Sequence, residues 1–417
     1  MKYKFITKPI VIKIPIHVND ELREFIFKNS NYRRKVWNDF VEEYRRCKEC
    51  DEKFNPTQYS TKYYNEVEKL SGTYTEYCIG IREQVSKDMK TALELCMQNH
   101  GDLHFKKFDR FRCAFKVHTK PTDVKLSSGI TRFNSRVYIV DNNLLQFRVS
   151  EKKTLYIQLK EFLFQDTILD EKEPIFCNKK LHCDFRERDI KEITFLHELG
   201  KFYVNLTVEV MYFNIKDKSR KKKAGIDLGI HNPVMLYDGE RCLCFRLSKK
   251  EITRLYYLER RRRRLQSILD RKTYQSMNYY KVLKKYRIAG KKMYNIRLNW
   301  RRKLAKKIAT TYRKICVDNY SIPTEQDHEI TNRYSIRKIN AYNRLHGMYY
   351  FYQSLIHTCD KYGCKYIEAP THTTCKCSNC SGINKHLPLS QRIFICEYCG
   401  YTIDRDINAA QNCYSYL

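Results

Sequence analysis

The sequence lacks any apolar run that approaches the roughly 20 residues needed to cross a bilayer. Its first residues, Met1–Ile6, include two lysines and lack the apolar core of a secretory signal peptide. Acidic residues are also scarce, with 47 Asp+Glu against 80 Lys+Arg and a formal net charge of +33. These deficits predict an intracellular protein of the cytoplasm or nucleoid, neither secreted nor associated with a membrane.

The excess of positive charge favours a polyanion as partner. The 33 Tyr and 21 Phe are interleaved with the basic residues, as suits stacking on unpaired bases. A merely basic soluble protein is the competing interpretation, and this charge makes it the weaker one. The cationic tract Arg260–Arg264 also resembles a nuclear-import signal, but a phosphate-binding helix is favoured. The candidate nucleic-acid-binding residues are Arg33, Arg34, Lys106, Lys107, Arg260, Arg261, Arg262, Arg263, Arg264, Arg301, Arg302 and Arg405.

Hydrophobic periodicity divides the 417 residues into segments of a multidomain α+β protein. An alternating strand is predicted over residues 3–16, helices from Asp20 to Asn99, and short strands from about Phe105 to Val210. Residues 1–16 and 105–215 therefore predict one β domain, a small barrel or sheet, interrupted by a helical insertion at 17–104. Residues 105–112 alternate aromatics with cations and fit a half-buried strand or a nucleic-acid-binding face equally well. Two long basic helices are expected within about 249–315.

Two C-x-x-C pairs near the C-terminus have the spacing of a zinc ribbon. Cys377 and Cys380 are separated by fifteen residues from Cys396 and Cys399. Four thiolates complete a tetrahedron, which predicts a structural zinc ion. Cys375 is not expected to be a fifth ligand. The pair Cys47-x-x-Cys50 has no matching partner pair, and the remaining cysteines fit buried thiols of an intracellular protein.

Three acidic positions are typical of a site for catalytic cations. Asp227 ends an apolar strand between two glycines, Asp318 ends a second strand, and Asp406 enters a helix rich in small residues. Acids on two strands and one helix can hold two Mg²⁺ or Mn²⁺ ions about 3.5–4 Å apart. This predicts RNase H-like cleavage of a phosphodiester. Glu368 is the weaker alternative to Asp318, Asp404 is expected to flank the site, and Arg405 either contacts phosphate or is exposed.

In these features the chain resembles the RuvC-containing nucleases TnpB (OrfB) and the related miniature type V CRISPR effectors. The resemblance rests on residues 225–230, the strand ending at Asp318, residues 367–377, the zinc ribbon and residues 404–412. It implies a wedge domain (1–16 and 105–215) with a helical recognition insertion (17–104). It also implies a RuvC-like domain (216–371 and 403–417) with an inserted target-nucleic-acid-binding zinc ribbon (372–402). The catalytic acids become Asp227, Asp318 and Asp406; the family usually has Glu at the second position.

The resemblance implies an RNA-guided DNA endonuclease with structural Zn, catalytic Mg or Mn, and a structured guide RNA as cofactors. Its partners would be that RNA and target double-stranded DNA, bound by a monomer or by a homodimer on one RNA. The short motif beside the target would be read by the protein and the remainder by base pairing. A transposase acting directly on DNA and a non-cleaving RNA-guided binding protein remain open alternatives. A purely structural zinc protein leaves the acids unexplained, and a transposon-encoded protein is not distinguished from a CRISPR effector.

Overall fold

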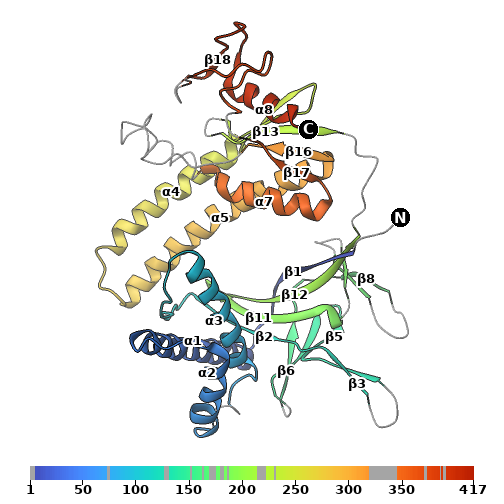
Figure 1. The fold of residues 1–417 in the computed structure, drawn as a ribbon. Helices are drawn as coiled ribbons and strands as arrows, with labels where there is room; N and C mark the ends of the chain where they lie inside the picture. Colours follow the sequence, from blue (N-terminus) through green and yellow to red (C-terminus); the bar gives the residue numbers. More distant parts are fainter. Residues whose placement is uncertain are drawn as a thin grey trace. The chain divides into compact units, whose positions relative to one another are not determined.

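The computed structural model describes two compact units, Phe5–Tyr212 and Phe213–Leu417 (Figure 1). We call them the N-terminal unit and the C-terminal unit. The described residues are 5–72, 76–125, 131–150, 153–161, 164–168, 175–178, 183–185, 187–213, 222–229, 232–318, 345–370, 373–385, 387 and 391–417. Across those ranges no helix combines the length and the apolar character that a membrane crossing requires. Most of the predicted linker at 216–223 lies outside the described residues.

A four-stranded sheet of order β1-β12-β11-β2 forms the centre of the N-terminal unit. Its strands are β1 (Phe5–Pro15), β2 (Arg112–His118), β11 (Ile190–Glu198) and β12 (Lys201–Phe213). Helix α1 (Asp20–Glu49) packs on this sheet, where the ring of Phe25 lies 5.5 Å from Phe115 and 5.7 Å from Phe195. The first strand thus lies beside a strand some 200 residues later in the chain, as one interrupted β domain requires.

Shorter elements complete the N-terminal unit. Helix α2 (Pro56–Tyr63) continues into a π-helix (Tyr64–Lys69), and α3 (Ile81–Gln98) follows. Strands β5 (Val137–Asp141), β6 (Leu144–Arg148) and β7 (Thr154–Gln158) form a three-stranded sheet. A two-stranded sheet is formed by β3 (Thr122–Lys125) and β4 (Thr131–Asn134). A three-stranded sheet is formed by β8 (Phe164–Ile168), β9 (Ile175–Asn178) and β10 (Cys183–Phe185). A 3-10 turn (Glu187–Asp189) precedes β11. Closure of these sheets into a barrel stays a prediction.

Residues 105–111 do not form a strand, so that interpretation of the alternating segment was wrong. The backbone of Lys106 bonds a side chain instead of a neighbouring strand. Its N–H donates to Asn38 Oδ1 (2.7 Å), and its carbonyl accepts from Asn38 Nδ2 (3.2 Å). Phe105 and Phe108 are exposed, at 43% and 59%. Alternation of aromatic and basic residues therefore did not reflect the two faces of a sheet.

The C-terminal unit has a mixed five-stranded sheet of order β15-β14-β13-β16-β17. Strands β13 (Lys223–Asp227), β14 (Val234–Tyr237) and β15 (Cys242–Phe245) are antiparallel neighbours. Strands β16 (Lys314–Val317) and β17 (Lys365–Glu368) continue the sheet parallel to β13. The parallel strands bring the ends of β13 and β16 to the same edge.

The two predicted basic helices are α4 (Lys249–Leu269) and α5 (Met277–Thr311), which pack against each other. Helix α5 buries Met293, Trp300, Leu304 and Ile308, which recur at helical spacing and form an apolar stripe. Helices α7 (Met348–Tyr362) and α8 (Arg405–Ser415) complete the unit (Figure 1). The ribbon contributes a hairpin of β18 (Ile393–Ile395) and β19 (Thr402–Asp404).

Helix α8 lies against β13 at van der Waals contact of the two backbones. A Cβ on Gly225 would stand 2.2 Å from the Ala410 carbonyl oxygen and 2.2 Å from the Tyr414 nitrogen. Ala409 and Ala410 are buried on this side of the helix. Only glycine at position 225 and small residues on the helix permit this approach.

We predict that Gly225→Ala destabilises the C-terminal unit by about 3 kcal/mol or more, because the clash is with backbone that cannot rotate away. Gly290→Ala is the matched control. Its Cβ would meet only the Arg262 Nε at 3.9 Å, and removing glycine from the middle of α5 should stabilise by about 0.5–1 kcal/mol. Urea unfolding followed by Trp300 fluorescence in a Trp37→Phe background measures both. Equal stabilities of the two variants would contradict the packing described above.

Candidate functional site

Two acidic side chains, Asp227 and Asp406, meet at the carboxyl end of β13, and a third acid, Asp318, follows the adjacent parallel strand β16. Asp227 is the last residue of β13, and Asp318 directly follows β16, with its N–H donating to the Ile226 carbonyl (2.9 Å). Asp406 lies in the first turn of α8. A Cβ on Gly229 would stand 3.6 Å from Asp227 Oδ2 and 3.8 Å from Asp406 Oδ2, so both carboxylates border one small space. The fold therefore brings together residues far apart in the sequence.

The electrostatics of this space favour a cation. Asp227 is only 6% exposed, and burial raises its pKa well above the ordinary value. The neighbouring charges of Asp406 and Asp318 raise this pKa further, while Arg405 and Arg392 oppose the rise. Carboxylate oxygens are the donors that Mg²⁺ and Mn²⁺ prefer. The residues present thus fit such an ion, which would relieve the repulsion among the three acids.

Two residues that were not predicted from the sequence form hydrogen bonds with Asp406. Its Oδ2 accepts hydrogen bonds from Asn232 Nδ2 (2.8 Å) and from Arg392 Nη2. Arg392 belongs to the ribbon and also forms an ion pair with Asp406. Asn232 lies five residues after Asp227, and that proximity was the available signal in the sequence. No pattern marked Arg392, because its contact arises only when the ribbon folds back toward α8.

The other acids of the region have distinct places. Asp404 caps α8: its Oδ1 accepts from the backbone N–H groups of Asp406 (2.9 Å) and Ile407 (3.2 Å). It therefore flanks the site, as expected. Glu368 is the last residue of β17 and lies beside Val317 of β16. Its side chain is exposed and accepts a hydrogen bond from the Tyr352 hydroxyl (3.0 Å). Glu368 thus stands one strand farther from Asp227 than Asp318 does. Arg405 is partly buried, and burial lowers the pKa of its guanidinium.

The four predicted cysteines converge in the ribbon. Their sulfur atoms all lie within 4.8 Å of one another, with Cys377 3.8 Å from Cys399 and Cys380 3.5 Å from Cys396. A tetrahedral zinc ion with Zn–S bonds of about 2.3 Å separates its sulfurs by about 3.8 Å. The backbone N–H of Tyr401 lowers the pKa of Cys399 to about 7. The Gly382 N–H also lowers the pKa of Cys380, but hydrogen bonds with Cys399 and Cys396 outweigh it and raise that pKa to about 12. The quartet can therefore bind zinc without rearrangement.

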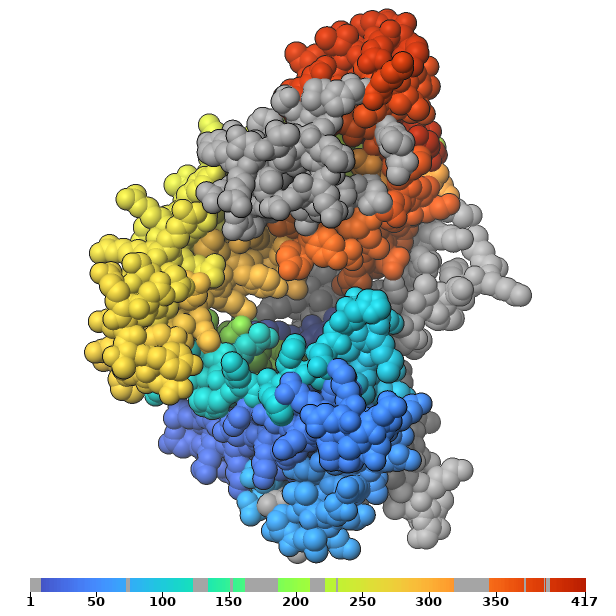
Figure 2. All heavy atoms as spheres, turned by 60° about the vertical axis from the view of Figure 1, so that its left-hand side comes forward, coloured from blue at the N-terminus to red at the C-terminus, as the bar shows by residue number. Residues whose placement is uncertain are grey.

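Some of the predicted nucleic-acid-binding residues are exposed to solvent, and others are bonded to groups of the protein itself. The exposed members on the helices of the C-terminal unit are Arg260, Arg261, Arg262, Arg263, Arg264 and Arg302, and the side chains of α4 stand out in yellow in Figure 2. Arg262 nevertheless donates to the Tyr286 hydroxyl (2.6 Å), and Arg263 to Glu259 (2.9 Å). Lys107 is exposed as well, and Arg34 is partly exposed.

Three further members of the set, which are buried or only partly exposed, also have partners inside the protein. Arg301 is 4% exposed, and its Nη1 donates to the Gly347 carbonyl (3.3 Å), so its burial contradicts the prediction that it binds nucleic acid. Its guanidinium also lies 5.2 Å from the Tyr350 ring of α7, because α5 packs against that helix. Lys106 lies 3.2 Å above the Trp37 ring, and burial lowers its pKa to about 7. Arg33 pairs with Asp88 (2.6 Å).

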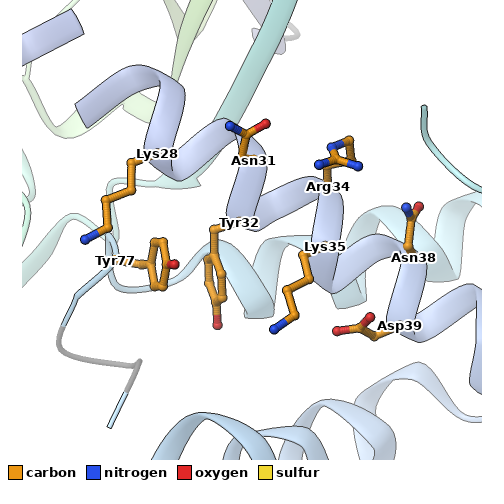
Figure 3. Close-up of a pocket in the computed structure, with 8 residues that line it drawn as sticks. All are labelled: Lys28, Asn31, Tyr32, Arg34, Lys35, Asn38, Asp39 and Tyr77. Atoms are coloured by element: carbon orange, nitrogen blue, oxygen red, sulfur yellow. The ribbon is translucent and has the colours of Figure 1, made fainter. Parts of the chain in front are cut away.

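A cavity of about 480 Å³ follows one side of α1 in the N-terminal unit (Figure 3). The rings of Tyr32 and Tyr77 are stacked 3.9 Å apart, and Lys28 lies 5.2 Å above Tyr77. The cavity combines cations, amides and aromatic rings, the groups that bind phosphates and bases. Its lining residues are Lys28, Asn31, Tyr32, Arg34, Lys35, Asn38, Asp39 and Tyr77.

We predict that Cys380→Ser and Cys396→Ser each reduce bound zinc from one ion per chain, because three thiolates leave the tetrahedron open. Cys375→Ser is the control, since this neighbouring thiol is outside the quartet and should retain full zinc. Metal analysis of the purified proteins measures the stoichiometry. Full zinc in the Cys380 and Cys396 variants would contradict the ligand assignment.

Two parts of the chain match protein-family models. Residues 203–322, which include Asp227 and Asp318, match the family OrfB_IS605, described as "Probable transposase". Residues 349–413, which include the cysteine quartet and Asp406, match the Cas12f1-like TNB domain.

Individual relatives match over shorter segments. A CRISPR-associated endodeoxyribonuclease Cas12f1 from Sulfoacidibacillus thermotolerans is 35% identical over 91 residues, 21% of each chain. The TnpB-like protein L79 of Acanthamoeba polyphaga mimivirus is 33% identical over 113 residues, 26% of this chain and 21% of L79. The matched segments thus span about a fifth of the length of these relatives.

The fold matches over nearly the whole chain. The solved Cas12f1–sgRNA–target DNA complex aligns with a TM-score of 0.53 at 14% identity, covering 98% of this chain and 99% of that one. At this identity the likeness establishes the mixed α/β multidomain fold alone. Through residues 203–322 and 349–413 the chain is similar to TnpB-like proteins and to the CRISPR-associated endodeoxyribonuclease Cas12f1.

Proposed function

We propose that this protein is an RNA-guided DNA endonuclease whose catalytic acids are Asp227, Asp318 and Asp406. The observation that carries the proposal is the convergence of Asp227 and Asp406 beside Gly229, with Asp318 on the adjacent parallel strand. Three antiparallel strands followed by two parallel ones give the sheet an RNase H-like order, which supports a RuvC-type domain. Oxygen donors grouped in this way suit two-metal phosphodiester hydrolysis.

The chain's own residues prepare the site. Bound Mg²⁺ or Mn²⁺ ions would supply Lewis-acid activation of water and stabilisation of the leaving oxygen. Asp227 is fixed at the end of a buried strand. The hydrogen bond from the Asp318 N–H to the Ile226 carbonyl fixes the backbone at the second acid. Asp318 is one methylene shorter than glutamate, so its carboxylate reaches less far. The Arg392 side chain is 34% exposed and can offer its remaining guanidinium donors to a DNA phosphate.

The nucleic-acid partners in this proposal are a structured guide RNA and target DNA. The net charge of +33, the exposed arginines of α4 and the cavity along α1 support them. One relative is itself a CRISPR-associated endodeoxyribonuclease, and one protein of similar fold was solved with sgRNA and target DNA. The protein would read a short adjacent motif, and base pairing would supply the remaining specificity. It would act inside the cell as a monomer or as a homodimer on one RNA.

A second candidate is an RNA-guided protein that binds DNA with weak or no cleavage. The observation favouring it is Asp318 at the position where related proteins usually have glutamate. The two candidates differ in their response to removal of Asp227, because only a nuclease loses an activity.

We predict Mg²⁺-dependent cleavage of a matched target, reduced at least about a thousandfold in Asp227→Ala, since loss of a metal ligand removes several kcal/mol of transition-state stabilisation. Asp270→Asn is the control, because this acid is an exposed residue at the end of α4. Cleavage assays with bound target quantified in parallel make the measurement. Equal inertness of wild type and Asp227→Ala, with both binding the target, would select the non-cleaving candidate.

We also predict that the expressed protein copurifies with a discrete RNA, since the proposed specificity depends on base pairing. Sequencing of the nucleic acid extracted from the purified protein is the measurement, and a protein of similar charge expressed in the same cells is the control. DNA cleavage by a preparation without any discrete RNA would instead support a transposase acting directly on DNA.

A further inference from the structure

Helix α8 joins the cysteine quartet to the carboxylates. It begins directly after β19, a strand of the ribbon hairpin, and Asp404 is both the last residue of that strand and the N-cap of the helix. Asp406 follows in the first turn. The chain therefore passes from the ribbon to a candidate catalytic acid without a linker, and the place of Asp406 depends on how α8 is held.

On the sheet side, α8 contacts β13 through small side chains along most of its length, and Tyr414 near its C-terminal end packs on Tyr237, with ring centroids 5.2 Å apart. The contact surface consists of small side chains, with Ala409, Ala410 and Cys413 at 1%, 0% and 0% exposure, opposite Gly225. Such side chains form no large knobs that would lock into a single register. Tyr414 lies at the opposite end of α8 from Asp406, so directional contacts nearer to Asp406 contribute to its position.

Those contacts are made by three carboxamide side chains on α8, Asn408, Gln411 and Asn412, which we call the carboxamide seam. Asn408 Nδ2 donates to the Lys376 carbonyl (2.7 Å), and its Oδ1 accepts from the Ser378 N–H (2.9 Å). Asn412 Nδ2 donates to the carbonyls of Lys376 (2.6 Å) and Thr373 (2.8 Å). Gln411 Oε1 accepts from the Ser378 hydroxyl (2.8 Å).

The carboxamide seam forms hydrogen bonds with the backbone on both sides of Cys377, one of the four cysteines of the quartet. Lys376 and Ser378 flank Cys377, which is completely buried. Asn408 is 0% and Asn412 2% exposed, so their amide groups are withdrawn from water and depend on these partners. The second half of the ribbon makes its own connection: the Arg405 N–H donates to the Arg392 carbonyl (2.9 Å), and the Arg392 side chain reaches Asp406.

We propose that Asn408 and Asn412 are positioning residues that couple the two metal sites. Zinc fixes the first cysteine knuckle, the seam transfers this conformation to α8, and α8 holds Asp406 beside Asp227. Zinc binding and divalent-cation binding then strengthen each other by the same factor, as linkage requires. The inference rests on the proposed function, because it needs a divalent cation at the carboxylates. It adds that the ribbon organises the catalytic acids as well as contacting nucleic acid.

The test measures Mn²⁺ affinity of the zinc-loaded full chain by electron paramagnetic resonance, without any nuclease assay. Asn408→Ala and Asn412→Ala should bind Mn²⁺ about 10–100-fold more weakly, the usual effect of removing a group that orients a ligand. Zinc content should remain one ion per chain. Ser415→Ala is the control, because this α8 hydroxyl donates to the Asn412 carbonyl of its own helix (2.7 Å) and its loss should leave Mn²⁺ affinity unchanged. Asp227→Ala identifies the site that is being titrated.

Failure of the inference and failure of the proposed function give different results. If the chain has no Mn²⁺ site that depends on Asp227, the proposed function itself is overturned. Mn²⁺ binding that depends on Asp227 but is unchanged in folded Asn408→Ala and Asn412→Ala would overturn only the coupling.

A second measurement uses the unaltered chain, in case the seam variants fail to fold. Co²⁺ replaces zinc in the ribbon, and its visible absorption reports thiolate coordination. Titration with and without Mg²⁺ should show a tighter Co²⁺ affinity when Mg²⁺ is present, and no such gain in Asp227→Ala. Identical Co²⁺ affinities with and without Mg²⁺ in the wild-type chain would overturn the coupling.

Discussion

The close approach of α8 to β13 is the contact on which the C-terminal unit depends. The Ala410 carbonyl and the Tyr414 nitrogen occupy the space where any side chain at position 225 would begin. The same approach places Asp406 opposite Asp227, at the edge where β13 and β16 end together. A single glycine thus determines both the packing of the last helix and the distance between two candidate metal ligands.

That packing concentrates negative charge, and the surrounding groups make the concentration tolerable. Asp404 and Asp406 lie at the N-terminus of α8, where the helix dipole and the free N–H groups favour acids. Arg392 contacts Asp406 directly, and Arg405 lowers the pKa of Asp227 against the effect of burial. Asn232 supplies a neutral donor to the same oxygen of Asp406 as Arg392. Two arginines and one amide therefore offset the negative charge of Asp227 and Asp406.

Local patterns predicted the elements whose formation depends on local spacing. The two basic helices, the strands before Asp227 and Asp318, and the grouping of the four cysteines were predicted from periodicity and motif spacing. Residues whose role depends on a distant partner could not be found in this way. Arg301 is a cationic residue of the kind that usually lies on the surface, but it is buried where α5 packs on α7. Lys106 lies against the Trp37 ring.

The same limit applies to the site and to the ribbon. Asn232 and Arg392 gain their partner only through tertiary contact with Asp406. Asn408 and Asn412 of α8 are polar residues, which usually lie on a solvated helix face, yet both are buried against the ribbon. Burial of polar side chains with complete hydrogen bonding was the feature that spacing rules could not detect.

Protons, cations and arginine all act on the same carboxylates. Because the pKa of Asp227 is raised in the folded chain, the folded state holds this proton more tightly than the unfolded state. Its contribution to stability is present below the ordinary aspartate pKa and is lost as the pH rises through the raised value. A divalent cation can replace that proton, since it supplies positive charge to all three acids at neutral pH. It must then also compete with Arg392 for Asp406.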